Sequence, residues 1–115
     1  MSETLRPLLH RDKIFLKELY ESDSITKSKR ILNFATDGEL NTLWKYLHFL
    51  SNGQIKIKKE HFEKVKDTQI KYMKKTFETK KSIQNLNHLP RKEKLQKLSK
   101  LTAIFPDILT PLFKQ

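Results

Sequence analysis

The segment TDGELNTLWKYLHFLSNG, residues 36–53, constrains the fold more than any other part of the chain. Thr36 and Glu39 have the spacing of a capping box, in which each side chain accepts a hydrogen bond from the other residue's backbone N–H. Asn52 and Gly53 mark the end, because glycine adopts the left-handed terminal conformation without steric cost. We expect a helix between these signals, with one narrow apolar stripe at the centre of the core. The stripe consists of Leu40, Leu43, Trp44, Leu47 and Leu50.

Helical periodicity also precedes this segment. Residues 4–20 carry their apolar side chains on one side of a 3.6-residue period, which predicts an amphipathic helix. The polar cluster at 21–24 supplies a break and a cap. A shorter helix over residues 25–35 is expected to bury Ile25, Leu32 and Ala35.

The second half of the chain predicts two more helices. We expect residues 54–58 to form an extended linker and residues 59–80 a long helix with one apolar and one lysine-rich side. Residues 82–90 predict a polar connector. Pro90 is placed to start the next helix, over 91–105.

Length and composition then limit the fold class. The chain has 115 residues, which fits one domain with one modest core. Two prolines interrupt the apolar C-terminal end, which predicts a turn and a short helix there. We therefore predict an all-α fold, a compact bundle of four to five helices in a single domain.

Several classes of protein are excluded by composition. The chain has no cysteine, so disulfides, cysteine-ligated metals and thiol catalysis are absent. Charged residues interrupt the apolar residues near the N-terminus, so no signal-peptide core is predicted. No apolar run reaches the roughly 20 residues of a membrane-spanning helix. We expect an intracellular protein that is not secreted.

Positive charge is concentrated in one half of the sequence. The net charge is +11. Residues 1–53 hold 8 Lys and Arg against 7 Asp and Glu, whereas residues 54–115 hold 16 against 6. The first half is therefore a near-neutral scaffold and the second half is basic. This asymmetry favours a polyanionic partner, either nucleic acid or an anionic membrane surface.

Nothing in the sequence predicts an enzyme. The histidines lack the paired spacing of a zinc site, so we expect surface or boundary positions and no metal. They are His10, His48, His61 and His88. No serine or threonine lies in a nucleophile-elbow context, and neither a cofactor nor a small-molecule substrate is indicated. Asp12 falls in an apolar arc, where we expect an ion pair at the helix edge.

The basic residues are the candidate functional set. Lysine meets phosphate as a mobile point charge, whereas reading bases usually requires Arg, Asn or Gln, so we predict sequence-independent contact with phosphates. Such binding weakens with salt. We expect DNA rather than RNA as the partner. The predicted nucleic-acid-binding residues are Lys56, Lys58, Lys59, Lys64, Lys71, Lys74, Lys75, Arg91, Lys92, Lys94, Lys97 and Lys100, with Lys80 and Lys81 beside them.

A second surface and a second function stay open. The apolar residues outside the main stripe are candidates for contact with a protein partner: Phe49, Phe105, Ile108, Leu109, Leu112 and Phe113. The alternative for each is burial by a neighbouring helix. The alternative function is a helical adaptor or assembly factor whose lysines only form a solvated face. Membrane association is disfavoured because prolines interrupt the tail.

The order of segments also resembles a family of known proteins. RILNFATDGELNTLWKYLHFLSNGQIKI is followed by the basic helix QIKYMKKTF, by LPRKEKLQKLSKL and by the apolar tail IFPDILTPLF. In this order, residues 30–113 resemble small basic proteins of Polinton/Maverick and adintovirus-like elements. The resemblance implies a viral or mobile-element accessory or core protein that acts near DNA, in the nucleus or the virion.

Overall fold

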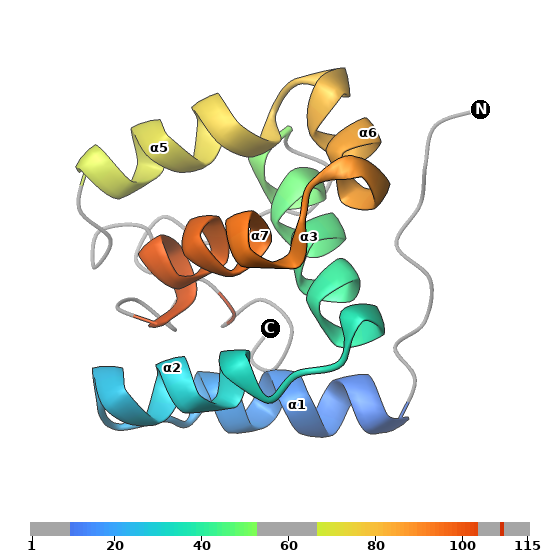
Figure 1. The fold of residues 1–115 in the computed structure, drawn as a ribbon. Helices are drawn as coiled ribbons and strands as arrows, with labels where there is room; N and C mark the ends of the chain where they lie inside the picture. Colours follow the sequence, from blue (N-terminus) through green and yellow to red (C-terminus); the bar gives the residue numbers. More distant parts are fainter. Residues whose placement is uncertain (1–9, 53–66, 104–108, 110–115) are drawn as a thin grey trace.

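Helix α3 (Asp37–Ser51) is the element against which most of the others pack. The computed structural model describes residues 10–52, 67–103 and 109. Within these residues α3 contacts four other helices: α1 (His10–Tyr20), α5 (Asp67–Phe77), α6 (Lys80–His88) and α7 (Arg91–Leu98). Figure 1 shows α1 and α2 side by side at one end of the molecule, α5 and α6 at the other end, and α7 between them. The core therefore surrounds α3.

The predicted start of α3 is confirmed. Thr36 Oγ1 accepts a hydrogen bond from the Glu39 N–H at 3.1 Å, and Glu39 Oε1 accepts one from the Thr36 N–H at 2.8 Å. All five residues of the predicted stripe are buried. The C-terminal half of α3 is buried on its other faces as well, including Tyr46, His48 and Phe49. A helix that is buried on every side is a central element rather than an amphipathic surface helix.

Helices α1 and α2 (Ile25–Asn33) form a helical hairpin, in which α1 packs against α3 and α2 packs against residues Ser99–Ala103. The predicted cap is present: Ser24 Oγ accepts a hydrogen bond from the Lys27 N–H at 3.1 Å. Leu32 and Ala35 are buried as expected, but the prediction for Ile25 is wrong, because half of its surface is exposed. Ile25 is the first residue of α2, and packing does not cover that turn.

Asp12 is buried on α1, and its observed partner differs from the predicted one. Its carboxylate accepts a hydrogen bond from the Thr42 hydroxyl at 3.2 Å. Within the described residues this hydroxyl takes the place of the expected cation.

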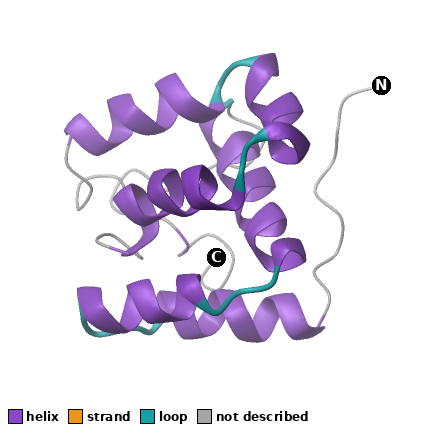
Figure 2. Cartoon of the chain, in the orientation of Figure 1, coloured by secondary structure: helices purple, strands orange, loops and turns teal. Residues whose placement is uncertain are grey.

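The predicted number of helices is too low. The described residues contain six α-helices and one turn of π-helix, η1 (Ser99–Ala103), and no strand (Figure 2). The long helix expected over 59–80 ends at Phe77 in its described part, and the polar connector expected over 82–90 is largely helix α6. The all-α class is confirmed, and the extra element is α6.

Helix α6 escaped prediction because its buried positions are mostly polar or only partly covered. Ser82, Leu86 and Leu89 follow a helical spacing, with Ser82 buried and the two leucines packed against the core. The Ser82 hydroxyl also lies 2.8 Å from the carbonyl oxygens of Phe77 and Thr79, and its one proton is shared between these two acceptors. The Thr79 carbonyl accepts from the Ser82 backbone N–H as well, so Ser82 donors serve carbonyls at the junction of α5 and α6.

Pro90 starts α7 as expected, and the helix changes geometry at Ser99. The backbone of Pro90, the N-cap residue, has φ −58° and ψ 148°, and Arg91 is the first helical residue. Leu98 and Leu101 are buried, and Leu95 packs against the same core. None of the helices in the described ranges is long and apolar enough to cross a bilayer.

Candidate nucleic-acid interface

The lysines of α5 form one exposed stripe. Lys71, Lys74 and Lys75 are exposed, at the i, i+3 and i+4 spacing that places side chains on one face of a helix. Met73 and Phe77 lie on the buried side of the same helix, where the Phe77 ring meets the Trp44 ring edge to face at 4.8 Å. The core thus fixes the rotation of α5 and directs the three ammonium groups into solvent.

The first turn of α6 continues this charge. Lys80 and Lys81 are both exposed, and no acidic residue lies in that turn. The N-terminus of a helix is the positive end of its dipole, so two lysines there add to an already positive potential. From Asp67 to Ala103 the chain holds ten Lys and Arg against three Asp and Glu. Acidic side chains therefore neutralise little of the charge.

A cation–π contact joins Lys100 of η1 to Tyr72 of α5. Lys100 Nζ lies over the Tyr72 ring, 5.1 Å from its centroid. The attraction between a cation and the face of an aromatic ring holds the ammonium group there. Tyr72 is only partly exposed and packs against the core. Lys100 and Lys92 are exposed and Lys97 is partly exposed. The two basic segments, far apart in sequence, meet at this contact.

Arg91 belongs to the predicted set but is bound within the fold. Its guanidinium donates to the Asp37 carboxylate at 2.7 Å and to the backbone carbonyls of Asn33 and Ala35 at 3.1 and 2.6 Å. These acceptors lie where α2 ends and α3 begins. Arg91 therefore ties α7 to the junction of α2 and α3, with only part of its fork left for a ligand.

Lys94 is likewise turned inward. The residue is buried as a whole, and its ammonium group donates to Asn41 Oδ1 at 3.0 Å and to the Leu86 carbonyl. In a continuing helix the Leu86 carbonyl would accept from residue 90, but Pro90 has no N–H. Burial lowers the pKa of Lys94, and the negative charge of Asp37 opposes that shift. Lys94 thus caps the end of α6 and is not a surface cation.

Other predicted residues lie outside the described part of the chain or inside the core. Lys56, Lys58, Lys59 and Lys64 fall outside the described residues, as do Phe105, Ile108, Leu112 and Phe113. Phe49 is 2% exposed, and Leu109 is fully buried. Neither of these two residues presents an open surface to a partner, so burial, the alternative considered for each, is what the structure has.

The structure also reveals a buried polar network that the sequence did not predict. His48 Nδ1 and Ser82 Oγ are 2.5 Å apart, and Trp44 Nε1 donates to the Ser82 carbonyl at 2.7 Å. His48 is buried, so its expected surface or boundary position is wrong. The serine and histidine resemble a catalytic pair in type, but Ser82 is 1% exposed, and a substrate would not reach it. The network fixes α6 to α3. No local spacing reveals it, because the partners are 34 residues apart.

Comparisons with known proteins leave the assignment to the chain's own geometry. Protein-family models, curated proteins and solved structures give no match to this sequence. Within the described residues, no group of three His, Asp or Glu side chains is arranged to hold a metal ion. The exposed lysines of α5, α6, α7 and η1 remain the candidate site.

Proposed function

We propose that the protein binds nucleic acid through phosphate contacts and without sequence preference. The observation that carries this proposal is the position of Lys100 over Tyr72. That contact brings Lys100 of η1 next to the α5 stripe, which supports the proposal that the two basic segments act as one surface. We define the lysine face as the exposed or partly exposed lysines of the predicted binding set, which are Lys71, Lys74, Lys75, Lys92, Lys97 and Lys100, with Lys80 and Lys81 of α6 beside it.

The chemistry of the lysine face favours phosphates over bases. Ammonium groups on flexible stems suit phosphate oxygens, whereas bidentate reading of guanine needs an arginine fork, and Arg91 is engaged inside the fold. Tyr72 lies under Lys100 and is partly buried, so base stacking has no free aromatic ring there. The proposed activity is binding alone, without catalysis or cofactor, and DNA is the preferred partner.

The proposed biological setting comes from the resemblance over residues 30–113. An accessory or core protein of a Polinton/Maverick or adintovirus-like element would act on DNA inside the nucleus or the virion. Capsid or polymerase genes beside the gene for this chain would support that setting, and a cellular gene neighbourhood without such genes would contradict it.

The direct test is a binding titration with a charge-reversed variant. Full-length protein is titrated against random duplex and single strands at two salt concentrations. The variant Lys71→Glu/Lys74→Glu/Lys75→Glu should bind at least about 100-fold more weakly and should lower the salt slope by about three, since each phosphate contact contributes about 0.9 to it. Circular dichroism should show unchanged helix content, because all three side chains are exposed.

A matched control separates a local site from total charge. Lys27→Glu/Lys29→Glu/Arg30→Glu makes the same change in net charge on exposed positions of α2. This control should retain most of the affinity. Equal losses in the two variants would show that net charge alone attracts the nucleic acid. Absence of binding at low salt, or binding indifferent to salt, would overturn the proposal and favour the adaptor function.

A further inference from the structure

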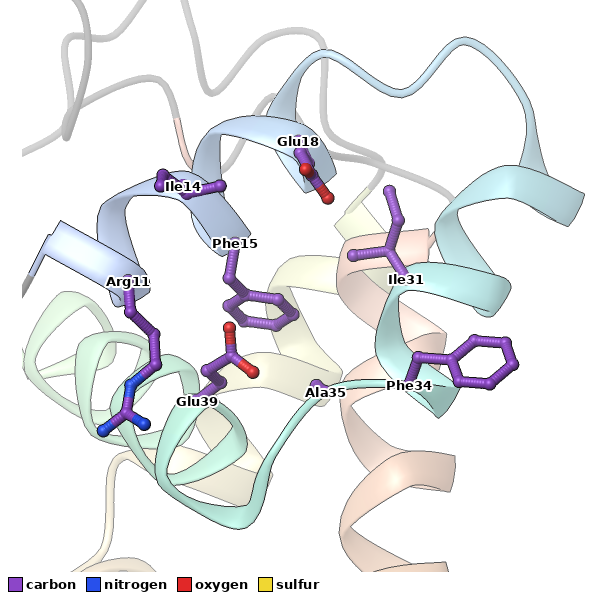
Figure 3. Close-up of a pocket in the computed structure, with 8 residues that line it drawn as sticks. All are labelled: Arg11, Ile14, Phe15, Glu18, Ile31, Phe34, Ala35 and Glu39. Atoms are coloured by element: carbon purple, nitrogen blue, oxygen red, sulfur yellow. The ribbon is translucent and has the colours of Figure 1, made fainter.

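A groove opens at the end of the molecule opposite α5. It has a volume of about 320 Å³ and lies between α1, α2 and the start of α3 (Figure 3). Phe15 lies in its floor and is almost fully buried, whereas Ile14 is 48% and Phe34 84% exposed. The residues that line it are Arg11, Ile14, Phe15, Glu18, Ile31, Phe34, Ala35 and Glu39.

Phe34 is the most unusual residue of this surface. It follows the last residue of α2, and its ring projects from the end of that helix into solvent in Figure 3. Single exposed aliphatic side chains are common, but a large aromatic ring beside an apolar groove is typical of an interaction site. The Phe34 ring projects from the surface beside the groove. The same surface therefore carries both a side chain that can insert into a partner and a groove that can receive one.

The charges on α1 show which partner fits. Arg11, Ile14 and Glu18 occupy positions i, i+3 and i+7, which places them on one face of the helix. The two charged residues are separated by about 10 Å along the axis. Neither has a salt-bridge partner among the described residues. Along α1 this face therefore carries a positive charge at Arg11, an apolar side chain at Ile14 and a negative charge at Glu18.

This order is complementary to itself under a two-fold axis. If two α1 helices cross antiparallel near Ile14, Arg11 of each copy lies opposite Glu18 of the second copy. An interface of this type uses the same patch on both subunits. Nucleic acid fits the groove poorly, because the carboxylates of Glu18 and Glu39 line it and repel phosphates.

We propose that this groove is the interface between two copies of the chain, with Phe34 of each copy inserted into the groove of the other. The pairing is small and depends on apolar contact, with the two Arg11–Glu18 pairs setting its orientation. Because α1 and α2 lie opposite α5 in Figure 1, the dimer would leave the α5 lysines Lys71, Lys74 and Lys75 of both copies free. The proposal does not rest on nucleic-acid binding.

Sedimentation of the full chain over a range of concentrations tests the interface. The wild type should show a reversible monomer–dimer equilibrium, and Phe34→Ser should weaken dimerisation at least about tenfold. Lys29→Glu, an exposed change on α2 outside the groove, should leave the equilibrium within about twofold. A wild type that stays monomeric up to about 1 mM, a concentration that matches only a very weak complex, would overturn the proposal.

A charge swap tests the symmetry. Arg11→Glu alone or Glu18→Arg alone places like charges opposite each other twice and should weaken the dimer about tenfold. The double variant Arg11→Glu/Glu18→Arg exchanges the members of each pair and should restore dimerisation to within about threefold of the wild type. If the double variant is no better than the single ones, the antiparallel two-fold arrangement is wrong. Both residues are exposed, so thermal unfolding should confirm that all variants remain folded.

Discussion

Two basic residues of α7 serve the fold, although their neighbours face solvent. Arg91 and Lys94 are three positions apart, and both donate to backbone carbonyls at helix ends. The acceptors are groups that helices leave without partners, and one of them lacks a donor because of Pro90. Lys92, one position from Arg91, stays exposed. At the scale of single residues, the backbone carbonyls within reach of a basic side chain decide whether that side chain lies at the surface or is bound within the fold.

Replacing Arg91 should destabilise the protein more than an exposed ion pair would. Asp37 is largely exposed, so the ion pair itself contributes little, but Arg91→Ala also removes the donor for two carbonyls. We expect a loss of about 1–2 kcal/mol in the free energy of unfolding, measured by urea denaturation. Lys92→Ala, at an exposed neighbour, is the control and should change stability by less than about 0.5 kcal/mol. Arg91→Lys should fail to restore stability, since one ammonium group does not reproduce the planar fork.

Lys94 should give the protein a stability that rises at alkaline pH. Burial lowers the pKa of its ammonium group in the folded state below the unfolded value of about 10.4. Between these two pKa values the unfolded chain binds more protons, so the free energy of unfolding increases with pH there. Lys94→Met removes this group, and the wild type should therefore gain stability relative to the variant as pH rises through that window.

Denaturant titrations of the wild type and Lys94→Met across the alkaline pH range measure this difference in stability. Contributions that are common to both proteins cancel in the difference between their free energies of unfolding. A difference that stays constant with pH would show that the folded protein leaves the Lys94 pKa unchanged.

At the scale of elements, α6 is the clearest case of a helix made by its contacts. Leu86 and the C-cap residue Leu89 are only partly buried, and the one fully buried position of α6 is Ser82. The Ser82 hydroxyl meets His48 and the end of α5, and its carbonyl accepts from Trp44. Hydrogen bonds between α3 and α6 thus hold α6 in place where a typical amphipathic helix would bury a larger apolar face.

Removing the Ser82 hydroxyl should therefore destabilise the protein despite better helix propensity. Ser82→Ala leaves the buried His48 Nδ1 without its partner, and an unpaired buried polar group costs about 1–3 kcal/mol. Thermal and urea unfolding measure the loss. Ser99→Ala, at a partly exposed serine, should have a smaller effect. An unchanged or raised stability for Ser82→Ala would mean that the network contributes no net stabilisation.

At the scale of the whole molecule, the α5 lysines and the apolar groove lie at different ends. The groove lies between α1, α2 and the start of α3, α5 lies at the other end, and α7 and η1 lie between them, with η1 packed against α2. The proposed dimer would therefore leave the α5 lysines free for the proposed binding of nucleic acid. Two lysine faces on one particle would also raise the effective concentration of the second face once the first is bound.

The net charge of +11 predicts that salt stabilises the folded monomer. Like charges are closer in the folded chain than in the unfolded one, and the Debye length falls from about 30 Å at 0.01 M to about 10 Å at 0.1 M salt. The melting temperature should rise by a few degrees over this range, as measured by circular dichroism. Lys71→Glu/Lys74→Glu/Lys75→Glu, with a net charge of +5, should show a smaller rise. An equal rise in both would point to a salt effect unrelated to charge repulsion.

Local sequence signals predicted the parts of the fold that depend on neighbours along the chain. The Thr36 and Glu39 pair specifies the start of α3 whatever surrounds it, since both bonds close within one turn. The stripe around Trp44 likewise predicted one buried side of α3, although the C-terminal half of that helix is buried on its other sides too, and the spacing of Met73 and Phe77 predicted the buried side of α5. Binary patterning is enough for these features because it repeats with the helix period.

In the candidate site, too, the features that depend on local sequence were predicted and those that depend on distant residues were not. The solvent exposure of Lys71, Lys74 and Lys75 follows from the period of α5 and was predicted from the sequence. The inward turn of Arg91 and Lys94 depends on carbonyls at distant helix ends, and the guanidinium of Arg91 reaches Asp37, 54 residues away in the chain. No local pattern distinguishes such a residue from an exposed lysine.

The sequence by itself determined the all-α class, the central helix and the placement of positive charge in one half, because helix period, capping and composition are local properties of the chain. Only the tertiary structure decided that α6 is a helix, that two predicted surface cations are structural, and that Phe34 stands beside an open groove. These features depend on which chain segments pack together. Hydrogen bonds between residues far apart in the sequence help to determine that packing, and the residue spacing within one helix does not predict them.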